Sequence, residues 1–118
     1  MMLVRRETGD QGGWIGTSSA PYTDWKFTPT KARVGGPDFI ELPDGSLGAG
    51  SRDHSQGKVK FSLFRMTWDS LQPALTLPSS GDCSYPVLVW HDGLLWVSYY
   101  SSHEGETSIY LAKVKWPL

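Results

Sequence analysis

The chain has little of several features that often indicate a function. It carries one cysteine, Cys83, so it can form no internal disulfide and no cysteine-based zinc site. No apolar run approaches the roughly 18 residues that a membrane-spanning helix needs, and the Met1 to Glu7 segment is too short for a signal peptide. Eleven basic residues stand against twelve acidic ones, which gives no charge excess for nucleic acid or an anionic membrane. We therefore expect a soluble chain with neither of these partners, in an undefined compartment.

Turn-forming and aromatic residues are abundant instead. The 118 residues include 13 glycines and 8 prolines, together with 6 tryptophans, 5 tyrosines and 4 phenylalanines. Glycine and proline interrupt helices, whereas aromatic residues suit pleated, half-buried surfaces. The composition therefore predicts one all-β domain of short strands and turns.

The sequence repeats itself about every 48 residues. The Asp-Gly pair at 44–45 matches the pair at 92–93, and at the same offset Gly57 falls on Gly105 and Leu63 on Leu111. One further step back from Gly57 reaches Gly9, so an incomplete third copy opens the chain. A period of this length is typical of propeller blades or solenoids.

Each copy predicts a set of antiparallel strands. An Asp-Gly pair between alternating apolar segments is a strong hairpin signal, and the glycine near 57 or 105 ends a second, polar loop. A fourth strand is expected over Ala74 to Leu77, and the fourth strand of the first copy is expected to end near 25–27. The other expected strands are Phe39 to Leu42, Leu47 to Arg52 and Lys58 to Met66 in one copy, and Val87 to Trp90, Leu94 to Tyr100 and Thr107 to Lys115 in the next.

Four-stranded antiparallel units in tandem describe β-propeller blades. The chain would hold about 2.5 of them: a partial blade over 1–30, a blade over 37–78 and another over 86–118. A β-sandwich with two similar hairpins is the alternative. An open wedge of blades leaves apolar faces and strand edges uncovered. We expect either a longer propeller or several copies that close a ring, with Trp90, Trp96 and Trp116 in the core between blades.

Residues suited to binding collect on one predicted rim, opposite the Asp-Gly turns. Guanidinium groups grip carboxylates, and aromatic rings stack on the apolar side of pyranose rings, so this rim favours an acidic or polyhydroxylated sugar. No cofactor and no metal is indicated, and Cys83 has no evident base beside it. The rim residues are Arg5, Arg6, Glu7, Asp10, Arg33, Asp38, Arg52, Asp53, His54, Asp82, Ser84, Tyr85, Tyr100, His103 and Glu104.

Two segments resemble the sialidase family of β-propellers. Glu41 to Arg52 is similar to the segment in which a Leu-x-Asp-Gly hairpin leads to an arginine that holds the substrate carboxylate. Asp82 to Leu88, followed by an Asp-Gly turn and a Val-Ser-Tyr-Tyr strand, resembles the segment with the tyrosine nucleophile. The stretch from Trp90 to Ala112 resembles the C-terminal part of bacterial sialidase-like proteins. The resemblance covers nearly the whole chain and about the last third of such a protein.

The resemblance implies a six-bladed propeller and a retaining glycoside hydrolase that works through a tyrosyl intermediate. By it, Arg52 would hold the substrate carboxylate and Tyr85 would be the nucleophile. A phenol needs a neighbouring carboxylate to accept its proton. The residues expected to contact the sugar, sialic acid or another acidic sugar, are Arg5, Asp53, His54, Asp82, Tyr100 and Glu104.

The chain also departs from the family pattern. The helper glutamate should fall near Gly36, where no carboxylate stands, and the Asp-box motif retains only Ser18 and Trp25. We therefore expect a glycan-binding propeller segment of glycosidase ancestry with an incomplete catalytic set. The alternatives are a piece of an active exo-sialidase, and a lectin-like or scaffolding module that closes a ring as a homo-oligomer.

Overall fold

The protein is built from β-strands alone over the residues that the structure, a computed structural model, describes, which are 1–116. The all-β prediction is confirmed, and no helix in this range is long and apolar enough to cross a membrane. The strands are β1 (Met2–Val4), β2 (Gly12–Thr17), β3 (Lys26–Arg33), β4 (Asp38–Glu41), β5 (Leu47–Asp53), β6 (Lys60–Met66), β7 (Leu71–Leu77), β8 (Ser84–His91), β9 (Leu94–Ser101) and β10 (Ser108–Val114).

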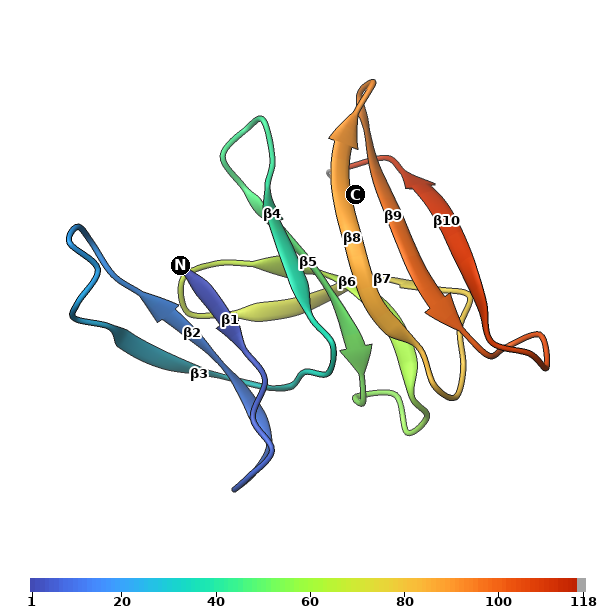
Figure 1. Ribbon diagram of the computed structural model, residues 1–118, viewed down its shortest axis with the longest axis horizontal. Coiled ribbons are helices and arrows are strands. Elements are labelled where there is room, and N and C mark those ends of the chain that lie inside the picture. The colour runs from blue at the N-terminus through green and yellow to red at the C-terminus, as the bar shows by residue number, and fades with distance from the viewer. Residues whose placement is uncertain (117–118) are drawn as a thin grey trace.

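The strands form three antiparallel sheets, each made from consecutive strands. The first sheet has the order β1-β2-β3, the middle sheet β4-β5-β6-β7 and the last sheet β8-β9-β10. Figure 1 shows the three sheets following one another from left to right, with the β4–β5 and β8–β9 turns at one end. The β5–β6 and β9–β10 loops lie at the other end. This second end is the rim on which the sequence predicted the binding residues.

Both predicted Asp-Gly hairpins form, but with different turns. Asp92 and Gly93 have φ angles of 53° and 73° and make the two-residue connection between β8 and β9. At the earlier pair only Gly45 has positive φ, at 84°. Here Gly45 donates its N–H to the Leu42 carbonyl at 2.9 Å, and Ser46 donates to the Asp44 carboxylate at 2.9 Å. Proline at position 43 suits the second position of a type I turn, so this loop is longer.

The repeat is visible in the backbone. Gly9, Gly57 and Gly105, one in each sheet's equivalent loop, all adopt positive φ, at 64°, 76° and 96°. The cross-strand pair of Gly50 with Leu63 matches that of Ser98 with Leu111 at this spacing, and the pair of Leu3 with Ile15 matches them after a one-residue gap before Ile15. Thus β1, β5 and β9 are equivalent, as are β2, β6 and β10.

These pairs define two faces for every sheet. The forward face carries the Leu3–Ile15, Gly50–Leu63 and Ser98–Leu111 pairs. The rear face carries the neighbouring pairs Met2–Gly16, Ala49–Phe64 and Val97–Ala112.

The sheets stack forward face to rear face. One apolar cluster holds Ile15 of the first sheet together with Ala49 and Phe64 of the middle sheet. The other holds Leu63 of the middle sheet together with Val97 of the last sheet. The middle sheet is therefore covered on both sides, because each of its faces packs on a neighbour.

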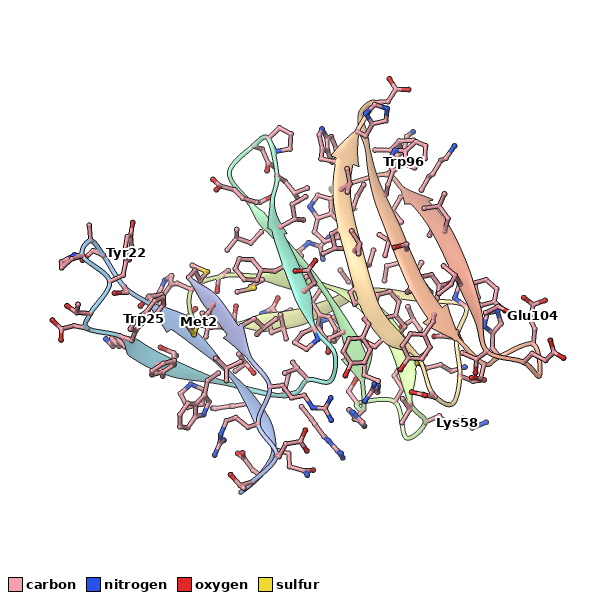
Figure 2. The ribbon with its side chains drawn as sticks, viewed as in Figure 1. Met2, Tyr22, Trp25, Lys58, Trp96 and Glu104 are labelled. Atoms are coloured by element: carbon pink, nitrogen blue, oxygen red, sulfur yellow. The ribbon has the colours of Figure 1, made fainter. Side chains whose placement is uncertain are left out.

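Two details of the predicted strands are wrong. A strand begins at Lys26 and runs to Arg33, rather than ending near 25–27. The reason is local: the Ser18 hydroxyl donates to the Asp24 carbonyl at 2.6 Å and the Trp25 indole to the Tyr22 carbonyl at 3.1 Å, which holds this segment as a loop. The second error concerns Trp96, which lies on the uncovered forward face of the last sheet (Figure 2).

Candidate functional site

The candidate site lies on the rim where the middle and last sheets meet. Arg52 is the penultimate residue of β5 and Tyr100 that of β9, and each stands two residues beyond the matched pair of its own sheet. Arg5 stands two residues beyond Leu3 in the first sheet. Three stacked sheets therefore place Arg5, Arg52 and Tyr100 at equivalent rim positions.

Arg52 is fixed by the loop that leads into the last sheet. Its Nε donates a hydrogen bond to the Cys83 carbonyl at 2.8 Å, and its Nη2 lies 3.9 Å from the Asp82 carboxylate. A Cβ added at Gly35 would lie 3.0 Å from the Arg52 Nη1 atom, so glycine leaves the room that the guanidinium occupies. The side chain is 18% exposed. It is thus oriented by protein contacts and still reaches the surface.

Two tyrosine rings lie beside this arginine. The Tyr85 and Tyr100 rings stack with centroids 6.0 Å apart and planes 14° apart, and the Arg52 guanidinium carbon is 6.0 Å from the Tyr85 centroid. The Tyr100 hydroxyl donates to the Asp82 carboxylate at 2.7 Å. Burial and this carboxylate raise the pKa of Tyr100 above its ordinary value, while Arg52 acts in the opposite direction. Tyr100 is therefore held in its protonated form. The Tyr85 side chain is 60% exposed, so its ring is accessible to a ligand.

The backbone that carries Tyr85 is unusual. Ser84 and Tyr85 have φ angles of 141° and 48°, which non-glycine residues rarely adopt. The buried Ser84 hydroxyl lies 2.8 Å from both the Gly35 and the Gly36 carbonyl oxygens, to which it donates. Gly36 has φ of 56° and packs on the Tyr85 ring, where an added Cβ would be 3.1 Å from Cδ2. Such strain costs on the order of 1 to 3 kcal/mol and is concentrated at functional sites.

Asp53 has a structural role here, in place of the sugar contact expected from the sequence. It is 2% exposed and accepts hydrogen bonds from the Ser55 N–H and hydroxyl, the Gln56 amide and the Ser62 hydroxyl, at 2.6 to 2.9 Å. Burial would raise the pKa of Asp53, but these hydrogen bonds outweigh it and hold the pKa below its ordinary value. Its oxygens are thus occupied in closing the β5–β6 loop.

His54 lies in a basic environment next to the candidate site. Burial lowers its pKa, and Arg33, Arg52 and Arg5 lower it further, whereas Asp53 acts against them. His54 and Arg33 line a hollow of about 250 Å³ between the first and middle sheets. Arg33, Arg52 and Arg5 therefore all act on His54, and of these Arg5 is paired with Glu7 and Arg52 lies beside Asp82.

Arg5 and Glu104 are farther from the tyrosine pair. Arg5 forms an ion pair with Glu7 at 2.6 Å. Glu104 accepts a hydrogen bond from the Tyr110 hydroxyl at 2.7 Å and lies at the outer end of the last sheet (Figure 2). Within residues 1–116, no hydrogen bond or ion pair joins Glu104 to Arg52, Asp82 or Tyr85. The structure thus brings together four of the predicted site residues: Arg52, Asp82, Tyr85 and Tyr100.

Sequence reasoning missed the residues that support this group. The sequence places Ser84 on the rim without indicating a role for it, and it does not indicate Gly35, Gly36 or the Cys83 carbonyl as partners. A signal was present: the Gly-Gly-Pro run at 35–37 aligns with the Ser-Tyr-Pro run at 84–86. In that alignment Tyr85 occupies the place of Gly36, and both have positive φ.

The site offers a guanidinium, a carboxylate and two phenol rings. No group of three His, Cys, Asp or Glu side chains in the described residues could hold a metal ion. Comparisons of the chain with protein-family models, with curated proteins and with solved structures found no match.

Proposed function

We propose that the chain is a sialidase-like β-propeller segment that binds an acidic sugar on this rim. The observation that carries the proposal is the group formed by Arg52, Asp82, Tyr85 and Tyr100, which comes from two stacked sheets and from the loop between them. An oriented guanidinium beside exposed aromatic rings suits a ligand with a carboxylate and an apolar ring face.

The arrangement of the sheets supports the propeller part of the proposal. Equivalent strands stack forward face to rear face, and equivalent loops gather at one end, as blades of one wheel would require. The two remaining Asp-box residues, Ser18 and Trp25, both form hydrogen bonds that close the β2–β3 loop. A β-sandwich would have two packed layers, whereas three sheets are layered here.

An acidic ligand is favoured by the charges around the rim. Arg33, Arg52 and Arg5 all act on His54, so their fields overlap at one place. Asp82 is the acidic member of the group, and it is engaged by the Tyr100 hydroxyl and by Arg52. A ligand carboxylate that reaches the Arg52 guanidinium would gain charge-assisted hydrogen bonds.

Binding is better supported than hydrolysis. A tyrosine nucleophile needs a carboxylate that takes its proton, and in the described residues no carboxylate is hydrogen-bonded to Tyr85. The position expected for that carboxylate is Gly36, which packs directly on the Tyr85 ring. Asp82 bonds the hydroxyl of Tyr100 instead.

The test compares N-acetylneuraminic acid with galactose, a neutral sugar, by ligand-observed NMR. The acidic sugar should bind more tightly, and Arg52→Ala should weaken its binding about 10- to 100-fold, as expected for loss of a charge-assisted hydrogen bond. Lys115→Ala is the matched control, because it removes one positive charge just after β10, at the end of the last sheet away from Tyr100. Equal binding of both sugars, or an equal loss in Lys115→Ala, would refute the proposal.

Tyr85 separates binding from catalysis. If its ring stacks on the sugar, Tyr85→Phe should bind like the unmodified protein while Tyr85→Ala should bind more weakly. An aryl sialoside assay should detect no turnover. Turnover that disappears in Tyr85→Phe would instead identify the chain as a hydrolase and overturn the binding-only function.

A further inference from the structure

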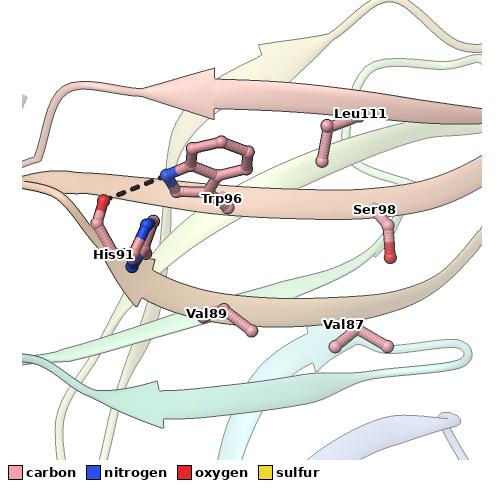
Figure 3. A pocket seen from close by; sticks show the side chains of 6 residues that line it. All are labelled: Val87, Val89, His91, Trp96, Ser98 and Leu111. Atoms are coloured by element: carbon pink, nitrogen blue, oxygen red, sulfur yellow. Dashed lines mark hydrogen bonds between the residues drawn. The ribbon is translucent and has the colours of Figure 1, made fainter.

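The forward face of the last sheet is largely apolar and open to solvent; its basic residues are Lys113, whose Nζ lies 4.3 Å from the centroid of the Trp96 ring, and His91. Its exposed side chains belong to β8 and β10, and they surround a hollow of about 280 Å³ that Trp96 and Ser98 of β9 also line (Figure 3). The exposed fractions are 58% for Val87, 48% for Val89, 77% for Ile109 and 60% for Leu111. Scattered apolar residues are normal on a surface, but a contiguous face of this kind indicates an interaction site.

The repeat shows what this face does in the other sheets. Leu111 is equivalent to Ile15 and Leu63, which are 0% and 1% exposed because their forward faces pack on the next sheet. Ile109 is likewise equivalent to Phe61, which is 0% exposed. Only in the last sheet is the same position open to solvent. Its residue types are therefore those of an interface between sheets.

Part of the complementary surface is also present in the chain: the first sheet has counterparts of β5, β6 and β7, although it has none of β4 or β8. Within the described residues, the forward faces of the first and middle sheets each pack on a rear face, and the rear face left uncovered belongs to the first sheet. Met2 and Phe27, 37% and 44% exposed, close over Gly16 on this face, where an added Cβ would meet both within 2.9 Å. The equivalents of Met2 and Gly16 are Val97 and Ala112 in the last sheet, where Val97 is fully buried.

We infer that the forward face of the last sheet binds the rear face of the first sheet in a second copy of this chain. The contact would continue the stack by the same face-to-face rule that joins its three sheets. It is head to tail, so it uses a different surface on each copy and can either close a ring or extend as an array. This inference does not depend on the sugar proposal.

Two charge substitutions test the contact, one on each face. Leu111→Glu and Phe27→Glu should each reduce the mass measured by light scattering to that of the 13.1 kDa monomer, whereas the unmodified chain should form larger species as its concentration rises. Trp68→Glu is the matched control, because Trp68 is 56% exposed in the β6–β7 turn and lies on neither face. Circular dichroism should show the same β-sheet spectrum for all variants.

Mixing the two variants distinguishes the possible contacts. A head-to-tail contact leaves one intact face on each variant, so the equimolar mixture should form a 1:1 dimer that grows no further. A contact between two forward faces would let Phe27→Glu associate alone and would give no rescue on mixing. That result, or an unmodified chain that stays monomeric at millimolar concentration, would overturn the inference.

Discussion

The Asp53→Asn substitution is the most informative test of how the rim is built. Asp53 accepts four hydrogen bonds in a buried position, two of them from Ser55. In the variant, the side-chain amide oxygen can still accept hydrogen bonds from Ser55. The new NH₂ group is a donor, and it faces two other donors, the Gln56 amide and the Ser62 hydroxyl. Hydrogen bonds to a charged group contribute about 1.5 to 3 kcal/mol each, and part of this is recovered if Gln56 and Ser62 reorient. We expect a loss of about 2 to 3 kcal/mol at pH 7.

The pH dependence provides the internal check. The folded-state pKa of Asp53 is below its ordinary value, so its contribution is present above the unfolded pKa near 3.9 and is lost as pH falls through the folded pKa. Urea unfolding at pH 7 should therefore separate the variant from the unmodified protein, and the difference should shrink steadily below pH 4. A loss of about 2 to 3 kcal/mol corresponds to a melting temperature lower by about 8 to 12 °C in a domain of this size.

The control for this experiment is Asp38→Asn, since Asp38 is exposed at the start of β4. It should change stability by less than about 0.5 kcal/mol. The reasoning is refuted if Asp53→Asn is as stable as this control at pH 7, or if the destabilisation is the same at pH 3 as at pH 7. Asp53→Asn should also leave sugar binding unchanged once folded, because its oxygens are engaged inside the loop.

Three further predictions concern the loops. Ser84→Ala removes the donor to two buried carbonyls and should lower the free energy of unfolding, measured in urea, by about 1 to 3 kcal/mol. The control, Ser98→Ala, should leave the free energy of unfolding almost unchanged. Gly93→Val should cost about 1 to 3 kcal/mol through its φ of 73° alone, since no neighbour lies within 4 Å of an added Cβ. Gly93→Asn should lose less stability than Gly93→Val, because asparagine adopts positive φ more readily, and an equal loss in the two variants would contradict this account. Burial raises the pKa of the Cys83 thiol, so alkylation at pH 8 should be at least about 100-fold slower than for glutathione, and urea should remove the difference.

Most of the correct predictions of strands came from residues that form turns. The Asp92-Gly93 pair and the glycines at 57 and 105 need positive φ, and glycine or aspartate at such places is informative on its own. This is why the strand order and the all-β class followed from the sequence.

The site could be predicted only in part, because its contacts join different sheets. Asp82 and Tyr100 could be placed on one rim, but their hydrogen bond depends on the path of the β7–β8 loop. Asp53 has no sequence feature that distinguishes it from an exposed charged residue at the end of a strand. The donor from Ser62 comes from the neighbouring strand, and no spacing in the sequence shows that the carboxylate turns inward. Ser84 was equally hidden, since its acceptors lie 48 and 49 residues away.

The outer sheets should unfold before the middle sheet, because the middle sheet is covered on both faces. Each outer sheet is held by one apolar cluster, while the middle sheet belongs to both. An outer sheet can therefore detach without exposing the opposite cluster, as in repeat proteins whose units depend on their nearest neighbours. Amide protons of β5 and β6 should be the last to exchange with deuterium, and the chain should melt from its two flanks inward.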